Sequence, residues 1–135
     1  MPHILQITPF LHVPDLAKAL DLLTRVLRFE VKYREANYAY LENGEAAIRM
    51  LEEPGRAEPA RGQARMTVYI DVRDVDALYA ELLTGLRTLP QGDVHAPIDQ
   101  TWNQREFHVR LPDGHWMAFG QPIRSGTAAP PTAGS

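Results

Sequence analysis

The sequence predicts an α+β fold of two tandem βαβββ modules, whose strands form a curved mixed sheet that encloses a cavity. Three observations support this prediction. The two halves of the chain repeat each other, each half contains one helix with a single apolar face, and each half ends in a hairpin signal. A period of about 60 residues that occurs only twice indicates duplication within one domain rather than a solenoid.

The repeat is visible when residue 13 is set against residue 72. Two pairs of segments then match: Val13–Leu16 with Val72–Val75, and Leu27–Arg28 with Leu86–Arg87. The common order of elements in both halves is therefore a strand, a helix and three further short strands.

The first half begins with a strand predicted over Ile7–Val13. The helix that follows has apolar residues at helical spacing, on one face: Leu16, Leu20, Leu23 and Leu27. Asp15 is its predicted N-cap, because a carboxylate can accept a hydrogen bond from the exposed backbone N–H groups of the first turn. Short β segments follow, and Asn43-Gly44 is the predicted hairpin turn.

The second half repeats this order after a Pro- and Gly-containing linker predicted over residues 53–64. A strand over Met66–Val72 precedes a helix capped by Asp74, whose apolar face carries Val75, Tyr79, Leu82 and Leu86. Asp113-Gly114 marks the second hairpin. We therefore expect a single domain over residues 1–121, with modules at about 3–52 and 65–121, and a disordered tail over 122–135.

Composition excludes several classes of function. The chain has 135 residues, no cysteine and a net charge of -3, so neither thiolate chemistry nor binding to nucleic acid or an anionic membrane is expected. Its N-terminus lacks the basic and apolar regions of a signal peptide, which favours the cytoplasm.

Alternation along the strands predicts which residues line the cavity. One face is apolar and should lie under the helices: Leu11, Val13, Ile48, Met50, Val68, Ile70, Val72, Met117 and Phe119. The other face is mixed, and with the loop residue Trp102 it supplies the candidate ligand-binding residues: Phe10, His12, Tyr38, Tyr40, Arg49, Tyr69, Asp71, Trp102, Glu106, His108 and Trp116. His3, His95 and His115 look exposed or turn-associated, and we assign them no role.

Over about residues 5–121 the chain resembles the vicinal-oxygen-chelate superfamily, which includes glyoxalase I, extradiol dioxygenases, fosfomycin-resistance enzymes and bleomycin-resistance proteins. Three segments carry the resemblance: Thr8–Leu16 with Val31 further on, Asp71–Leu78, and Gln100–Gly114. Residues Gln100–Phe107 look like the Gln-x-Trp-Gly-x-Arg-Glu-Phe segment of the bleomycin-resistance proteins, with Asn103 where glycine is usual. The resemblance implies the glyoxalase/bleomycin-resistance fold.

Enzymes of this superfamily usually hold a divalent metal ion with one side chain from each of four strands. The resemblance maps those positions onto Thr8, Arg49 (give or take one residue), Thr67 and Ala118. Imidazole and carboxylate groups bind such ions, whereas threonine is a weak donor, alanine has none and a guanidinium repels a cation. We therefore expect neither a metal nor another cofactor at these positions.

Members of the superfamily without a metal include drug-sequestering homodimers that hold their ligand in grooves between the chains. The resemblance therefore implies a metal-independent protein that binds a small aromatic or glycopeptide-like molecule, an antibiotic being one candidate. Exchange of the N-terminal strand between the two chains, with a proline near the exchange point, is common among these homodimers, and Pro9 could serve as that proline. Two departures weaken the drug-resistance interpretation. The resistance proteins of the family are markedly acidic, whereas this chain has 17 acids against 14 bases. Arg49 would discourage a polycationic ligand and could instead bind a carboxylate or phosphate on another ligand.

The rival interpretation is an enzyme, a lyase, isomerase or dioxygenase, with an unconventional metal site at His12, Glu106 and His108 or with metal-free acid–base chemistry. A third is a structural or regulatory subunit whose cavity is filled by side chains. Glu106 and His108 could simply be bonded to each other, and Arg49 could pair with Glu106 or Asp71. Trp102 could pack at a dimer interface instead of contacting a ligand, and Trp116 could be a cross-strand packing residue.

Overall fold

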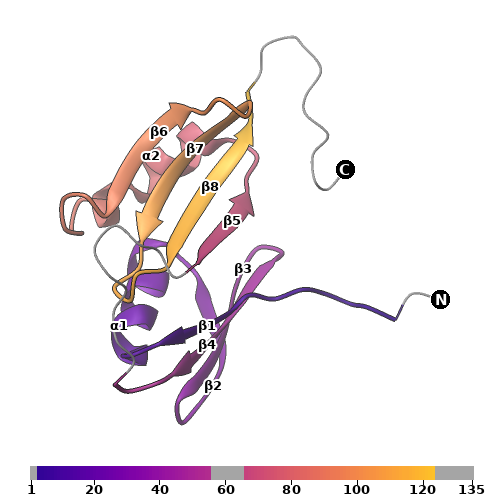
Figure 1. Ribbon diagram of the computed structural model, residues 1–135, viewed down its shortest axis with the longest axis vertical. Coiled ribbons are helices and arrows are strands. Elements are labelled where there is room, and N and C mark those ends of the chain that lie inside the picture. The colour runs from indigo at the N-terminus through magenta and orange to yellow at the C-terminus, as the bar shows by residue number, and fades with distance from the viewer. Residues whose placement is uncertain (1–2, 56–65, 124–135) are drawn as a thin grey trace.

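A computed structural model describes residues 3–55 and 66–123, and it arranges the strands in two four-stranded sheets (Figure 1). The first sheet has the strand order β1-β4-β3-β2 and the second has β5-β8-β7-β6. The same order in both halves, with one helical segment after the first strand of each, confirms the predicted pair of βαβββ modules. The architecture is therefore α+β with two mixed sheets.

The first module contains four strands: β1 (Phe10–Val13), β2 (Glu30–Glu35), β3 (Tyr38–Asn43) and β4 (Ala46–Glu52). Strand β1 runs parallel to the central strand β4, with Phe10 opposite Arg49. Strands β2, β3 and β4 are antiparallel neighbours. Gly44 makes the β3–β4 turn with a φ of 59°, a left-handed conformation that glycine adopts without steric cost.

Helix α1 (Leu16–Asp21) continues directly into a π-helical segment, η1 (Leu22–Val26). The Asp15 side chain accepts a hydrogen bond from the backbone N–H of Lys18, so the predicted N-cap is present. Thr24 donates its hydroxyl hydrogen to the carbonyl oxygen of Leu20 at 2.7 Å, a bond that is typical of distorted helical turns.

The second module repeats the first with strands β5 (Thr67–Asp71), β6 (Val94–Asp99), β7 (Gln104–Arg110) and β8 (Trp116–Pro122). Its helix α2 spans Val75–Leu86, and Asp74 caps it by accepting a hydrogen bond from the N–H of Ala77. Strand β5 runs parallel to β8, with Tyr69 opposite Ala118. Helix α2 covers one face of this sheet and leaves the other face open (Figure 1).

The expected core forms on the helix side of both sheets. Leu11, Met50, Met117 and other predicted inward residues are buried in one continuous apolar cluster, against which Val68, Ile70 and Tyr79 pack while partly exposed. The modules meet where η1 approaches α2 closely, because a Cβ built on Gly85 would lie 3.2 Å from the Cα of Val26. His115 also links the modules, since its Nε2 lies 3.3 Å from the carbonyl oxygen of His12.

Three expectations about local structure were wrong. The first strand begins at Phe10 rather than Ile7, because Pro9 has no N–H to continue the ladder. Pro122 and Ile123, assigned to the tail, belong to the folded part: Pro122 ends β8, and the Ile123 N–H bonds to the carbonyl oxygen of Asn103. His115 directly follows the Asp113-Gly114 turn, as expected, but it is buried rather than exposed. The remainder of the predicted tail, 124–135, and linker residues 56–65 lie outside the described residues.

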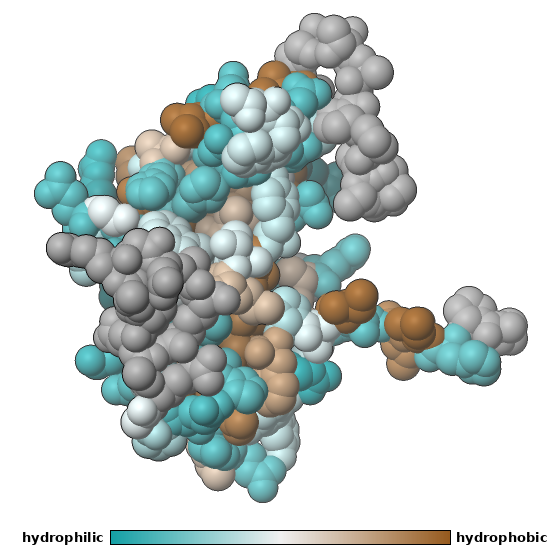
Figure 2. Space-filling model, viewed as in Figure 1, coloured by the Kyte–Doolittle hydropathy of each residue, from teal (hydrophilic) through white to brown (hydrophobic). Residues whose placement is uncertain are grey.

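Residues 3–9, which precede β1, extend away from the two sheets (Figure 1). This segment carries three strongly exposed apolar side chains: Ile4 at 82%, Leu5 at 97% and Ile7 at 89% exposure. Figure 2 shows them as brown residues that project from the body of the molecule. Apolar side chains in that position bury nothing within the described chain.

None of the helices in residues 3–55 and 66–123 has the length and apolar character needed to cross a membrane.

Candidate functional site

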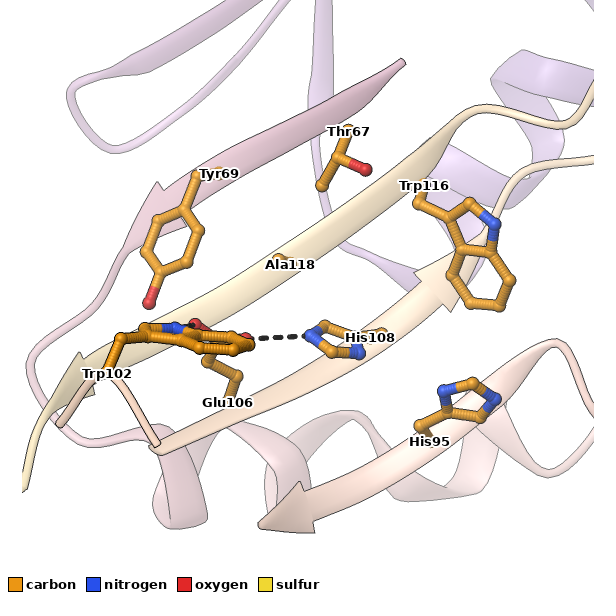
Figure 3. Close-up of a pocket in the computed structure, with 8 residues that line it drawn as sticks. All are labelled: Thr67, Tyr69, His95, Trp102, Glu106, His108, Trp116 and Ala118. Atoms are coloured by element: carbon orange, nitrogen blue, oxygen red, sulfur yellow. Dashed lines mark hydrogen bonds and ion pairs between the residues drawn. The ribbon is translucent and has the colours of Figure 1, made fainter. Parts of the chain in front are cut away.

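The open face of the second sheet holds a pocket of about 360 Å³. All four strands of the sheet and the β6–β7 loop contribute to it (Figure 3). The lining residues are Thr67, Tyr69, His95, Trp102, Glu106, His108, Trp116 and Ala118. Most of this surface is aromatic or imidazole ring, with a single carboxylate among the lining groups, which suits a planar ligand with a polar or cationic group.

Glu106 is the buried acid of the pocket, with only 2% of the residue exposed. It lies on β7, where Trp102 donates its indole N–H to one carboxylate oxygen at 2.8 Å and the Nε2 of His108 lies 2.9 Å from the other. The expected hydrogen bond between Glu106 and His108 is therefore present. A buried carboxylate needs such partners, because burial without them favours its neutral form.

These hydrogen bonds decide the charge of Glu106. Burial acts to raise the pKa of the Glu106 carboxyl, but hydrogen bonding to Trp102 and His108 acts in the opposite direction, and the pKa lies below its ordinary value. Glu106 is therefore an ionised, pre-oriented acceptor at neutral pH. Burial raises the pKa of the Tyr69 phenol, and the negative charge of nearby Glu106 acts in the same direction, so Tyr69 stays a neutral donor.

Tyr69 forms one wall of the pocket from strand β5. Its hydroxyl group donates a hydrogen bond to the Gln104 side-chain oxygen at 3.0 Å, and its ring lies against Gly120, where the neighbouring strand has no side chain. Neither Gln104 nor Gly120 was selected from the sequence. Only the pairing of β5 with β8 and of β8 with β7 reveals their positions.

Trp102 lies on the loop between β6 and β7 and is 57% exposed, although its indole N–H is bonded to buried Glu106. Asn103 follows it with a φ of 66°, in the left-handed region. Asparagine tolerates this region better than most residues, so it can replace the glycine that the related segment usually carries. The loop thus places one face of a large ring across the pocket (Figure 3).

The other end of the pocket is formed by three rings. The His95 ring centroid lies 5.2 Å from that of Trp116 and 6.0 Å from that of His108. Trp116 is therefore a wall of the pocket as well as a packing partner. His95, which was assigned no role, lies on β6 directly opposite His108 in the strand register. A period-2 assignment of residues 94–99 would have found it.

The family model described as the Glyoxalase/Bleomycin resistance protein/Dioxygenase superfamily matches residues 1–119. The chain belongs to this superfamily. The match covers both modules and the whole pocket, so it confirms the family that the sequence segments indicated.

Within the superfamily, bleomycin resistance proteins are among the similar proteins. Those of Geobacillus stearothermophilus and Staphylococcus aureus are each 26% identical over 137 residues, covering 90% of this chain and 99% of the relative. The bleomycin-binding protein of Streptomyces verticillus, solved with copper(II)-bleomycin, has a TM-score of 0.70 at 20% identity and covers 93% of this chain and 100% of its own. The bleomycin resistance determinant of transposon Tn5 has a TM-score of 0.72 at 22% identity, with 88% and 98% covered. At these identities the solved structures establish the fold.

The predicted site residues lie on both sheets rather than around one pocket. Tyr69, Trp102, Glu106, His108 and Trp116 share the pocket. The other candidates, with one exception, lie on the first module: Phe10, His12, Tyr38, Tyr40 and Arg49. The sequence predicted the two modules but placed candidates of both in one cavity, because strand alternation assigns a face of a sheet and does not say which faces adjoin.

Asp71 is the exception, because it lies on the second module but does not line this pocket. It ends β5 and lines a different cavity of about 440 Å³, beside the start of α2. Arg49 also differs from expectation, since neither Glu106 nor Asp71 is its partner: its Nε donates to the Thr8 hydroxyl group at 2.9 Å and its Nη1 to the Tyr38 hydroxyl group at 2.5 Å.

The unconventional metal site is not assembled either. His12 lies on β1, where its ring bonds to Glu53 and packs edge-on against Phe10, whereas Glu106 and His108 lie on β7 in the other sheet. Within residues 3–55 and 66–123 there is no group of three or more histidine, aspartate or glutamate side chains arranged to hold a metal ion.

Proposed function

We propose that this protein binds a small organic molecule of the bleomycin type, with aromatic and cationic parts, without a metal ion of its own. The observation that carries the proposal is the ionised carboxylate of Glu106 at the floor of an aromatic pocket, held in place by Trp102 and His108. The names of the bleomycin resistance relatives support the same class of ligand.

The pocket suits this ligand for two physical reasons. A buried carboxylate attracts a cation more strongly than an exposed one, because water screens the interaction less. The rings of Tyr69, Trp102 and Trp116 offer flat apolar surface for stacking and negative ring faces for a cation. Thr67 and Ala118, at two of the family's usual metal positions, offer no strong ligand for an ion.

The proposal includes a homodimer in which the N-terminal segment of each chain packs on its partner. Ile4, Leu5 and Ile7 support it, because strongly exposed apolar side chains that are grouped on one extended segment are typical of a protein–protein contact. A two-fold arrangement would give two equivalent grooves. Each groove would combine the open face of one sheet with residues from a second copy.

Isothermal titration calorimetry with metal-free bleomycin and with copper(II)-bleomycin tests the proposal. We expect saturable binding of both compounds at one site per chain. Glu106→Gln keeps the size of the side chain and removes its charge, and should weaken binding by about 10- to 100-fold, the usual cost of losing a charge-assisted hydrogen bond. Asp71→Asn is the matched control, because it removes a carboxylate that lies outside the pocket.

Equal affinity of the wild-type protein and Glu106→Gln would contradict the role of this carboxylate. Failure of both compounds to bind the folded wild-type protein would contradict the proposed function itself.

A further inference from the structure

The pocket of the second module has a structural counterpart on the first. Phe10 pairs with Arg49 between β1 and β4 as Tyr69 pairs with Ala118 between β5 and β8. Tyr40 pairs with Arg49 between β3 and β4 as His108 pairs with Ala118 between β7 and β8. Arg49 therefore occupies the position in its module that Ala118 occupies at the floor of the pocket.

Extending this register relates five lining residues of the pocket to five residues of the first module. Thr67, Tyr69, Glu106, His108 and Ala118 correspond to Thr8, Phe10, Tyr38, Tyr40 and Arg49 in that order. The two faces differ in charge: the second module has a buried carboxylate at its centre, and the first has a guanidinium.

Arg49 is held by its neighbours rather than neutralised by them. Its Nε bonds to Thr8, its Nη1 bonds to Tyr38, and its guanidinium carbon lies 4.8 Å from the centroid of the Tyr40 ring. No ion pair joins Arg49 to a carboxylate in the described segments 3–55 and 66–123. A guanidinium has five N–H donors, so with two of them used here three remain for a ligand.

Two acids of the first module bond to groups other than Arg49. Glu42 accepts a hydrogen bond from the Tyr40 hydroxyl group at 3.1 Å, and Glu53 bonds to His12. Within the part of the chain that the structure describes, the guanidinium is thus fixed in orientation and has no carboxylate partner. A planar fork held in this way matches a carboxylate, which it can bind with two parallel hydrogen bonds.

We infer that Arg49 is a second recognition point for the same ligand and binds a carboxylate on it, so that the ligand carries an anionic group as well as the cationic group that Glu106 receives. This inference rests on the proposed function. In the proposed dimer, the first-module face of one chain would form part of the groove whose other part is the pocket. The preferred ligands are then amphoteric aromatic molecules rather than simple polycations.

Two probes that differ only in the anion test this inference. Benzylamine carries an aromatic ring and an ammonium group, and 4-(aminomethyl)benzoate adds a carboxylate at the opposite end of the ring. Their dissociation constants can be measured by NMR titration of ¹⁵N-labelled full-length protein, using the indole N–H signal of Trp102 and the Nε–H signal of Arg49. Metal-free bleomycin, measured alongside, tests the pocket independently.

We expect 4-(aminomethyl)benzoate to bind about tenfold more tightly than benzylamine, as an arginine–carboxylate contact would give. It should also shift the Arg49 Nε–H signal more than benzylamine does. In Arg49→Gln the two probes should bind alike. Arg34→Gln is the matched control and should keep the preference for 4-(aminomethyl)benzoate. Arg34 is exposed and pairs with buried Ala39, so it lies on the face of the sheet opposite to that of Arg49.

Equal affinities of the two probes for the wild-type protein, or a preference that survives in Arg49→Gln, would overturn the inference. If bleomycin still binds in that case, the proposed function remains intact. The Arg49 signal gives a result in the wild-type protein even if Arg49→Gln does not fold, and equal shifts with both probes would count against the inference. Absence of binding by all three compounds would overturn the proposed function, and the inference with it.

Discussion

The ring of Tyr69 lies directly against the backbone of Gly120. A Cβ built on Gly120 would be 2.0 Å from the phenol oxygen of Tyr69 and 3.0 Å from the Cγ of Glu106. Glycine is needed here for space and not for backbone conformation, since Gly120 is not among the residues with a positive φ. One missing side chain on β8 therefore lets Tyr69 and Glu106 share the pocket.

Gly120→Ala should consequently displace both side chains. We expect it to lower the free energy of unfolding by about 1–3 kcal/mol, the usual cost of overpacking, and to weaken bleomycin binding as well. Chemical denaturation and calorimetry measure the two effects. If the clash with Tyr69 is the cause, Gly120→Ala should cost much less in a Tyr69→Ala background. A cost that is the same in both backgrounds would contradict this explanation.

The ionisation of Glu106 should depend on the Trp102 indole N–H. We expect the ¹³C signal of the Glu106 carboxyl group to titrate with a midpoint below the ordinary value of 4.5, because its hydrogen bonds outweigh the effect of burial on the pKa. Trp102→Phe keeps a ring in the loop but removes the donor, and should raise the midpoint. An unchanged midpoint in Trp102→Phe would show that this bond does not set the pKa.

The same pKa shift predicts a pH dependence of stability. A carboxyl group with a lower pKa in the folded state binds its proton more weakly there than in the unfolded state. Its contribution to stability is therefore fully present above its ordinary pKa of 4.5 and is lost as the pH falls through the lower folded value. Stability of the wild-type protein relative to Glu106→Gln, measured by urea denaturation, should decline in that acidic range. A decline that is complete well above pH 4.5 would contradict the assignment.

The junction between the modules should be sensitive to the size of residue 85. Gly85→Val adds a branched side chain where even a Cβ would lie 3.2 Å from the Cα of Val26. We expect it to cost about 1–3 kcal/mol of unfolding free energy. Thr84→Val introduces the same residue at an exposed position of the same helix and should change stability by less than about 0.5 kcal/mol. Equal effects of the two variants would contradict packing against η1 as the cause.

The N-terminal segment should govern association. Full-length protein is expected to have the mass of two chains in light scattering after size exclusion, and a variant lacking residues 1–7 should shift toward the mass of one. Ile4→Ser combined with Leu5→Ser and Ile7→Ser should act in the same direction, because all three exposed apolar side chains are removed. A single-chain mass for the full-length protein would contradict the dimer, and a two-chain mass for both variants would contradict the role of the segment.

Local features of the fold followed well from the sequence. The N-caps Asp15 and Asp74, the apolar helix faces and the inward strand residues were predicted, because short-range periodicity and capping depend on neighbouring residues alone. The expected start of β1 was wrong, since ladder pairing depends on a distant strand and on the missing N–H of Pro9.

The candidate site was predicted only in part. Tyr69, Trp102, Glu106, His108 and Trp116 were found from alternation and the Gln100–Phe107 segment, but the sequence joined them to residues of another sheet. His95 and Gly120 were missed, because their roles arise from cross-strand neighbours that are far apart in the chain.

The sequence by itself determined the family, the repeated module and the kinds of side chain that face away from the helices, because these depend on residue type and spacing along the chain. Only the tertiary structure decided that Glu106 lies in an aromatic pocket while Arg49 lies on the corresponding face of the other module, bonded to no carboxylate among residues 3–55 and 66–123. The register between strands distant in sequence brings these groups to their neighbours, and spacing along one strand carries no information about that register.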